Sequence, residues 1–276
     1  MAGKYLGRSD APFGEKVWKH LDDAAIGAAR AQLSVRRLID IEGPYGLGTK
    51  SVPTTDVPTK HEIKMGDVTA SASGPGIIPL AGINSIFQIG MRDIAAFEQI
   101  GAPFDTRAVA HAAIAVARME DELLLNGSRE LGTEGLLGLK GSISHSIKSW
   151  KTIGAAVDDI IAAVTKMDNA GIHGPYALGL APSLYNLLLR RYEHGEMTEM
   201  DHVKRVVTEG VVKLPALDSG GVLIATGRIY ASVVIGQDLM AGFIGPIEGA
   251  FEFSLSESVA LRIKHPSAVC ALAAAK

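Results

Sequence analysis

The sequence predicts an α+β fold in which a few amphipathic helices and antiparallel strands are joined by one long extended arm. Three observations support this prediction. Apolar residues recur with helical spacing over 12–35, 105–126 and 155–169, and the tail beyond residue 250 alternates apolar and polar residues. The stretch 46–86 is rich in glycine and proline and has little helical period.

The first expected helix begins at Pro12 and extends to about Val35. One side of it carries Trp18, Leu21, Ala25, Ala28, Ala29, Gln32 and Leu33. Beyond Leu21 this side is mostly alanine, so it is shallow and suits close approach by another segment.

Residues 46–86 predict an extended arm, in the form of a long β-hairpin with the polar centre KHEIKMGD. Such a composition cannot bury much surface against its own chain. Long stretches of this kind inside a compact protein are usually functional. An arm that leaves its domain commonly contacts another subunit.

The middle of the chain predicts three more helices and several buried strands. One helix is capped by Asp105 and stops at Asn126-Gly127, and the next covers 155–169. The last covers 182–192 and begins at a proline, a good first-turn residue. The apolar runs YALGLA, GVLIAT and YASVVIG indicate buried strands.

The tail predicts an antiparallel pair of strands with one face in a core. The inward residues are Phe251, Phe253 and Leu255 on the first strand, and Val259, Leu261 and Ile263 on the second. A turn is expected near Ser256 to Ser258, where the run becomes polar.

Composition excludes several classes of protein. The chain is 47% hydrophobic with a net charge of −3, which is typical of a globular protein and gives no large positive field for nucleic acid. The single cysteine, Cys270, lies in an apolar run and is expected to be a buried hydrophobe in a reducing compartment. With no signal-peptide pattern and no membrane-spanning run, the protein is expected to be soluble and cytoplasmic.

A search for catalytic or ligand-binding motifs finds little. The sequence contains no phosphate-binding loop, no Gly-x-Gly-x-x-Gly between a strand and a helix, and no Gly-x-Ser-x-Gly. Glu193, His194 and Glu196 are a weak candidate for metal binding, and Glu120 to Glu122 are expected to be a solvated or salt-bridged helix face. We therefore predict no cofactor, no metal and no enzymatic activity.

The tripeptide Gly-Pro-Tyr occurs twice, at 43–45 and 174–176. The sequences around the two copies do not match, which argues against an internal duplication. Each copy is instead expected to form a corner, with glycine for a permissive dihedral, proline to set the next one and tyrosine as an anchor.

Five motifs resemble one known family. They are RSDAPFGEKVW, RRLIDIEGPYG, GIHGPYALGLAPSLYNLL, VVIGQDLMAGF and FEFSLSESVALRIKHPSA. Their order and spacing resemble those of the family 1 encapsulin shell proteins, the linocin-like bacterial nanocompartment proteins that share the HK97-like fold of tailed-phage major capsid proteins. The resemblance covers about residues 5–272.

The resemblance implies a division of the chain into three parts. Residues 1–45, 85–136 and 229–276 would form a peripheral domain, 46–84 an extended arm (E-loop), and 137–228 an axial domain whose tips meet at symmetry axes. The implied function is a self-assembling icosahedral shell of about 60 copies that encloses a cargo enzyme and limits access through pores.

The resemblance also implies two sites. A short terminal targeting peptide of the cargo would bind along the first helix and just beyond it, at Ala25, Ala29, Leu33, Arg36 and Asp40. A loop would line a five-fold pore with Glu193, His194, Gly195 and Glu196. A phage-type major capsid protein and a Ser/His/Asp hydrolase are the alternatives, and the identity of the cargo stays open.

Overall fold

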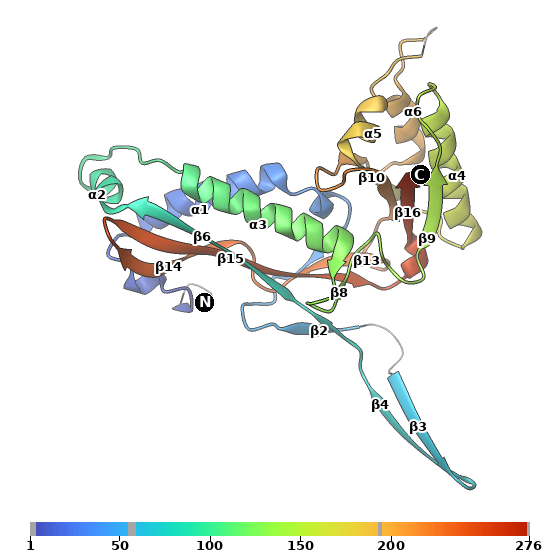
Figure 1. The fold of residues 1–276 in the computed structure, drawn as a ribbon, viewed down its shortest axis with the longest axis horizontal. Helices are drawn as coiled ribbons and strands as arrows, with labels where there is room; N and C mark the ends of the chain where they lie inside the picture. Colours follow the sequence, from blue (N-terminus) through green and yellow to red (C-terminus); the bar gives the residue numbers. More distant parts are fainter. Residues whose placement is uncertain (1–3, 55–58, 193–194, 275–276) are drawn as a thin grey trace.

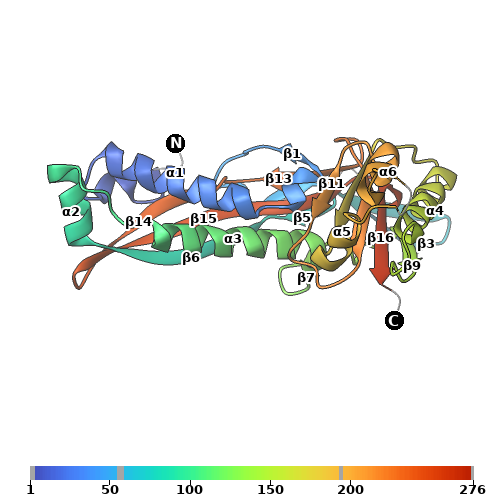
Figure 2. The same cartoon turned by 90° about the horizontal axis from the view of Figure 1, so that it is seen from above.

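The computed structural model describes residues 4–54, 59–192 and 195–274. The chain forms a flat, elongated body from which one arm projects, and Figure 2 shows this body edge-on. Two β-sheets organise the body; each has a hydrophobic core of its own, and a third core contains residues of both sheets. The α+β fold class is thereby confirmed.

The first sheet carries the long helices. In this sheet β1 pairs with β13, and both β13 and β14 pair with β15. β6 pairs with the other edge of β15. The strands are β1 (Asp40–Glu42), β6 (Ala81–Gly90), β13 (Ala231–Ile235), β14 (Met240–Ile247) and β15 (Ala250–Ile263). The helices α1 (Glu15–Gln32) and α3 (Arg107–Asn126) pack against each other and against this sheet, and α2 (Met91–Ile100) closes its far end (Figure 1).

The core beneath these helices is aromatic as well as aliphatic. Phe253 is fully buried, and its ring stacks on Phe87 from β6 with 5.1 Å between centroids. Ala25 and Ala29 of α1 lie in the same core and allow α1 to approach α3 closely. The shallow alanine side of the first helix therefore packs mainly within the chain.

The expected turn at Ser256 to Ser258 is wrong, because β15 runs unbroken for 14 residues. Alternate residues of an unbroken strand face the same side of the sheet, so Glu257 points to the same side as Leu255 and Val259. Its carboxyl group is buried and accepts a hydrogen bond from Arg36, which explains how an acidic residue can lie in the middle of a core strand.

The second sheet has the order β11, β10, β12, β16, β9. Its strands are β9 (Ile143–Ile147), β10 (Tyr176–Leu180), β11 (Val211–Lys213), β12 (Gly221–Ala225) and β16 (Val269–Ala274). The helices α4 (Ala155–Asn169), α5 (Pro182–Leu187) and α6 (Glu199–Val206) accompany it (Figure 1). The sequence analysis placed all of 229–276 in the peripheral domain, and the structure differs in one respect. β16 pairs with β12 and β9, so this last strand belongs to the second sheet.

The arm is a β-ribbon. At its root β2 (Ser51–Pro53) pairs with β5 (Ile77–Pro79), and beyond it β3 (Thr59–Met65) pairs with β4 (Val68–Gly74) through a two-residue turn. Gly66 opens this turn with φ of 62°, which suits glycine. The expected long hairpin is confirmed, and it points away from the body (Figure 1).

The remaining elements are short. The strands β7 (Gly127–Ser128) and β8 (Thr133–Glu134) form a small hairpin after α3. Single 3₁₀ turns occur at Arg8–Asp10, Val35–Arg37 and Pro266–Ala268. Among the described residues, no helix is long and apolar enough to cross a membrane.

Both Gly-Pro-Tyr tripeptides are corners, with a cis Gly-Pro bond and a positive φ at the glycine. Their tyrosines differ. The Tyr176 hydroxyl donates to Asp168 and to the carbonyl of Ile172, so this tyrosine is an anchor. Tyr45 is 54% exposed, so the expected anchoring role is wrong for the first copy.

Candidate functional site

A groove lies beside the C-terminal half of α1. It encloses about 400 Å³, and its apolar lining residues are Ile26, Ala29, Leu33, Ile41 and Leu239. Its other lining residues are charged: Arg30, Arg36, Arg37, Asp238 and Glu257. A groove lined by both apolar and charged side chains suits an extended peptide better than a small polar metabolite.

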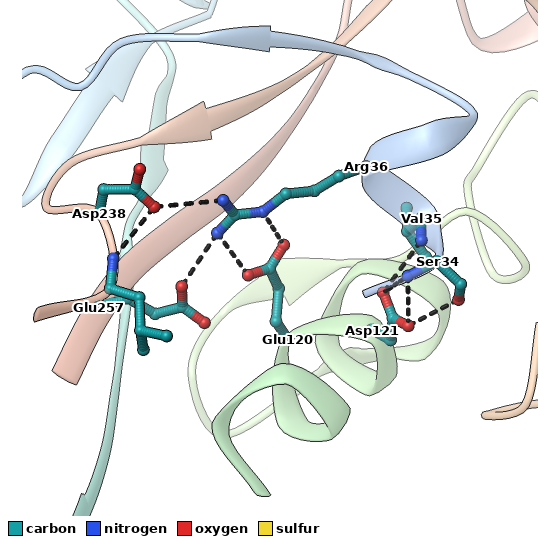
Figure 3. Close-up of polar contacts among 8 residues, drawn as sticks. Ser34, Val35, Arg36, Glu120, Asp121, Asp238 and Glu257 are labelled. Carbon is teal, nitrogen blue, oxygen red and sulfur yellow. Dashed lines mark hydrogen bonds and ion pairs between the residues drawn. The ribbon is translucent and has the colours of Figure 1, made fainter. Parts of the chain in front are cut away.

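Arg36 is the centre of the charged cluster (Figure 3). Its guanidinium donates to both carboxylate oxygens of Glu120 at 2.6 Å, to Glu257 at 2.9 Å and to Asp238 at 3.2 Å. The carboxylates come from α3, from β15 and from the loop between β13 and β14. This one side chain therefore joins the segment after α1 to the sheet and to the second long helix.

The cluster holds more acid than base. Burial raises the pKa of the Glu257 carboxyl to about 9, and the charge of Glu120 adds to this rise while Arg36 opposes it. Burial opposes the charge of Arg36, but the hydrogen bond and charge of Glu120 outweigh it and raise the pKa of the guanidinium. Near neutral pH, Glu257 therefore holds its proton and Arg36 remains charged.

Asp121 fixes the start of the 3₁₀ turn that presents Arg36 (Figure 3). Its carboxylate accepts from the Ser34 hydroxyl at 2.6 Å and from the backbone amides of Ser34 and Val35 at 2.9 and 3.0 Å. Burial raises the pKa of Asp121, and these hydrogen bonds oppose the rise. Glu120 and Asp121 are thus buried structural groups, whereas Glu122 is exposed on the expected solvated face.

The five positions expected for a bound peptide do not lie together. Ala29 and Leu33 line the groove. Ala25 is 2% exposed within the core and does not line it. Arg36 lines the groove, and four of its five N–H donors are already bonded to three carboxylates. Asp40 is an exposed residue of β1 outside the lining.

The sequence analysis did not identify several residues that line the groove. Three of them, Ile26, Arg30 and Arg37, could have been identified from their spacing. They recur at helical spacing with Leu33, one position away from the alanine stripe. Ile26 is 39% exposed, as expected for a residue on the open side of a helix.

The arm presents a second candidate surface. Because paired residues of a hairpin share a face, Ile63, Met65, Val68, Ala70 and Ala72 lie on one side together with His61, and we call this side the apolar face of the hairpin. Glu62, Lys64, Thr69, Ser71 and Ser73 lie on the other, the polar face. Met65 is 78% and Val68 is 70% exposed, so the apolar face is uncovered in the single chain.

The segment after α5 is the third candidate. Glu193 and His194 lie outside the described residues, while Gly195 and Glu196 are exposed. The base of this segment is rigid: Arg190 pairs with buried Glu199 at 2.8 Å and donates to the carbonyls of Trp150 and Lys151. Among the described residues, no three acidic, histidine or cysteine side chains are placed to hold a metal.

Comparisons with known proteins place the chain in a family. The family model described as "Encapsulating protein for peroxidase" matches residues 3–260. The type 1 encapsulin shell protein of Myxococcus xanthus is 33% identical, covering 97% of this chain and 96% of its own. A diheme-cytochrome-encapsulin shell fusion protein of Kuenenia stuttgartiensis is 31% identical over 96% of this chain and 74% of its own.

Solved structures agree on the fold. A virus-like particle of Pyrococcus furiosus superimposes with a TM-score of 0.72 at 21% identity, covering 93% of this chain and 99% of that one. The capsid of Myoviridae phage XM1 gives a TM-score of 0.63 at 14% identity, covering 86% and 90%. The chain therefore belongs to the encapsulin shell protein family, and it is a shell protein with the HK97-like capsid fold.

Proposed function

We propose that this chain assembles into a closed icosahedral shell of about 60 copies, which encloses a cargo protein in the cytoplasm and performs no catalysis itself. The division into a peripheral domain, an arm and an axial domain belongs to this proposal, with β16 added to the axial sheet. Membership of the encapsulin shell family supports assembly and cargo enclosure.

The arm is the observation that carries this proposal. A two-stranded ribbon is marginally stable alone in water, and an uncovered apolar surface usually marks an interaction site. The hairpin has both properties, because its apolar face is exposed and no other element in the described part of the chain covers it. Contacts made by such an arm with a neighbouring copy are heterologous, and they close into rings and shells when rotation allows.

Sizing tests assembly directly. The purified protein should elute in the megadalton range, and replacing 59–74 with a Gly-Ser pair should leave soluble small species. The ratio of absorbance at 260 and 280 nm then shows what the shells contain, because this ratio is higher for packaged nucleic acid than for enclosed protein. Shells of unchanged stability without the hairpin would contradict the role given to the arm, and copurified nucleic acid would favour a capsid.

We also propose that the groove beside α1 binds a short targeting peptide at the terminus of the cargo. Ala29 and Leu33 remain in this site, Ile26, Ile41 and Leu239 are added to its apolar lining, and Arg36 acts by holding the groove together. Ala25 would support the helix from the core, and Asp40 would bond the peptide only where it leaves the groove.

Substitution of Ile26 tests the groove without disturbing the core. Ile26→Glu places a charge where apolar peptide side chains would be buried, so shells should form at normal size but lose the cargo. Ile161→Glu is a matched control, because Ile161 is 45% exposed on α4. Full loading of Ile26→Glu shells would contradict the groove assignment.

Finally, we propose that the segment containing Glu193, His194, Gly195 and Glu196 lines a pore at the five-fold axes. Acidic and titratable groups repeated around an axis select small cations over anions. Glu196→Lys should slow entry of a cationic substrate into loaded shells at low salt, while Glu130→Lys, the same change on an exposed turn elsewhere, should not. Equal entry rates for both variants would count against the pore.

A further inference from the structure

A pocket lies against the first sheet on the side away from α1 and α3, next to the start of the arm. It encloses about 530 Å³, within the range of about 300–1,000 Å³ that small-molecule sites usually have. Ser256 and Ser258 line it, on the opposite face of β15 from the core residue Leu255. Lys50 and Asn84 also line it, and both are exposed. The pocket is therefore open to solvent and has a polar side.

Gln237, in the loop after β13, has an unpaired oxygen at this pocket. Its side chain is 4% exposed, and its Nε2 donates to the backbone carbonyl and the hydroxyl of Ser256, both at 3.1 Å. A carbonyl oxygen can only accept, so this contact fixes which end of the amide is the nitrogen. The other end, Oε1, is buried and has no hydrogen-bond partner within 4–54, 59–192 and 195–274. A buried oxygen of this kind requires a donor.

Glu257 presents a second buried oxygen at the same pocket. Its Oε2 accepts from Arg36, while its Oε1 has no partner in the described part of the chain. The pairing of β15 with β13 ends at Val259 and its pairing with β14 begins at Ser256, so this edge of β15 carries no strand at Glu257. Glu257 therefore lines both this pocket and the groove beside α1, on opposite sides of the sheet.

The polar groups of the pocket need both a donor and an acceptor. Gln237 Oε1 needs a donor, whereas the hydroxyls of Ser256 and Ser258 accept from Gln237 and keep a hydrogen that they can donate. Burial raises the pKa of Glu257 to about 9, so these four side chains carry no net charge near neutral pH. A hydroxyl group both donates and accepts, so neighbouring hydroxyls match these groups better than an ammonium or a carboxylate does.

We propose that this pocket binds a small uncharged polyol or sugar, whose hydroxyl groups bond Gln237, Ser256 and Ser258. The carbon skeleton of the ligand lies against the apolar side chains of Leu47 and Leu80. A single water molecule, whose share of liquid volume is about 30 Å³, fills only a small part of such a pocket. The site is separate from the peptide groove and does not depend on the shell function.

Saturation-transfer NMR on the purified protein tests the site, because this method detects weak binding of small ligands. Glucose and sorbitol are the probes, one a ring and the other an open chain. At least one of them should bind with a dissociation constant of about 1 mM or tighter. Glucosamine should bind at least about tenfold more weakly than glucose, because its ammonium group meets no counter-charge in the pocket and is repelled by Lys50.

Three results with these probes would overturn the proposal. If neither glucose nor sorbitol bound, water alone would fill the pocket. If glucosamine bound as tightly as glucose, the pocket would not select an uncharged ligand. If glucuronate bound more tightly than glucose, Lys50 would be recognising an anion and the assigned class of ligand would be wrong.

Gly82→Val fills the pocket without removing any of its polar groups. Gly82 is paired with Ser258 on the pocket side of the sheet, and a Cβ there would meet nothing within 4 Å, so the valine side chain extends into the pocket. Binding of the probe should weaken by at least about tenfold. Gly138→Val is the matched control, because a Cβ at Gly138 also meets nothing within 4 Å and Gly138 does not line the pocket. Equal binding by the two variants would place the ligand elsewhere.

Two more variants separate this site from the peptide groove. Gln237→Leu removes the unpaired oxygen at similar side-chain size, so it should weaken binding by about tenfold or more, and unchanged binding would contradict the role of Gln237. Ile26→Glu changes the groove and should leave glucose binding unaltered. Normal loaded shells that bind no polyol would refute only this inference, whereas glucose binding by a protein that forms no shells would refute only the shell function.

Discussion

Replacing Glu257 with glutamine should remove one pH dependence from the stability of this protein. Burial raises the pKa of Glu257 from about 4.5 to about 9, so the folded chain keeps a proton that the unfolded chain releases. A group with a raised folded-state pKa stabilises the fold at low pH, and this contribution is lost as pH rises from about 4.5 to about 9. Glutamine keeps the shape of the protonated acid but cannot ionise.

The expected size follows from the one proton involved. One proton of difference changes the free energy of unfolding by about 1.4 kcal/mol per pH unit. Between pH 6 and 8 the wild-type protein should therefore lose ~3 kcal/mol more than Glu257→Gln. Glu257 is only 3% exposed, so solvent screening does not reduce this difference substantially.

The assay is guanidinium unfolding of shells at fixed protein concentration and salt, followed through the fluorescence of Trp18 and Trp150. Contributions from assembly and from titrating groups outside the Arg36 cluster are common to both proteins and cancel in the comparison. Glu248→Gln, an exposed acid at the β14–β15 turn, is the control and should follow the wild type. Parallel curves for wild type and Glu257→Gln from pH 6 to 8 would refute the reasoning.

Two further substitutions test the backbone corner and the loop base. Gly43→Ala would place its Cβ 2.3 Å from the carbonyl oxygen of Ile235, at φ of 113°. Gly46→Ala is the control, because Gly46 has a similar φ of 106° and a Cβ there would meet nothing within 4 Å. Gly43→Ala should therefore lower the thermal midpoint of unfolding clearly more than Gly46→Ala. Equal midpoints would exclude the overlap as the cause. Arg190→Met leaves the buried carboxylate of Glu199 unpaired and should cost about 3–5 kcal/mol in denaturant unfolding, while the exposed neighbour Arg191→Met should change little.

The sequence predicted the long, strongly periodic elements well. The helix expected over 155–169 has those bounds. The one expected to be capped by Asp105 begins at Arg107, and its N-cap is Thr106 instead. Both carry a continuous apolar stripe and end close to a glycine. The arm was predictable for a different reason, since its composition could not support a core and only a hairpin satisfies its backbone groups.

Elements that depend on tertiary contacts were not predictable in the same way. The expected helix over 182–192 ends at Leu187, because the backbone there turns to accept hydrogen bonds from Glu199 and Met200. Glu199 and Met200 begin α6, and a capping box between Thr198 and Asp201 stabilises the start of this helix. Glu257 looked like part of a turn because its partner, Arg36, is far away in sequence.

The candidate peptide site shows the same limit. Periodicity identified the helix and the half of it that borders the groove, but two adjacent stripes fit the sequence equally well. The choice between them depends on what covers each stripe, and α3 covers the alanine side. The contribution of Leu239 and Asp238 comes from a loop some 200 residues away, which no local pattern in α1 can indicate.

The pairing of β6 with β15 has a mechanical consequence. β6 leads from the root of the arm into the body and is hydrogen-bonded to β15 from Ala81 to Gly90 in an unbroken antiparallel ladder. A force that pulls the arm along β6 loads this ladder in shear. All of its hydrogen bonds are then strained together instead of one after another. Swelling of a full shell from within would therefore be resisted by the whole of this ladder wherever it pulls the arm along β6.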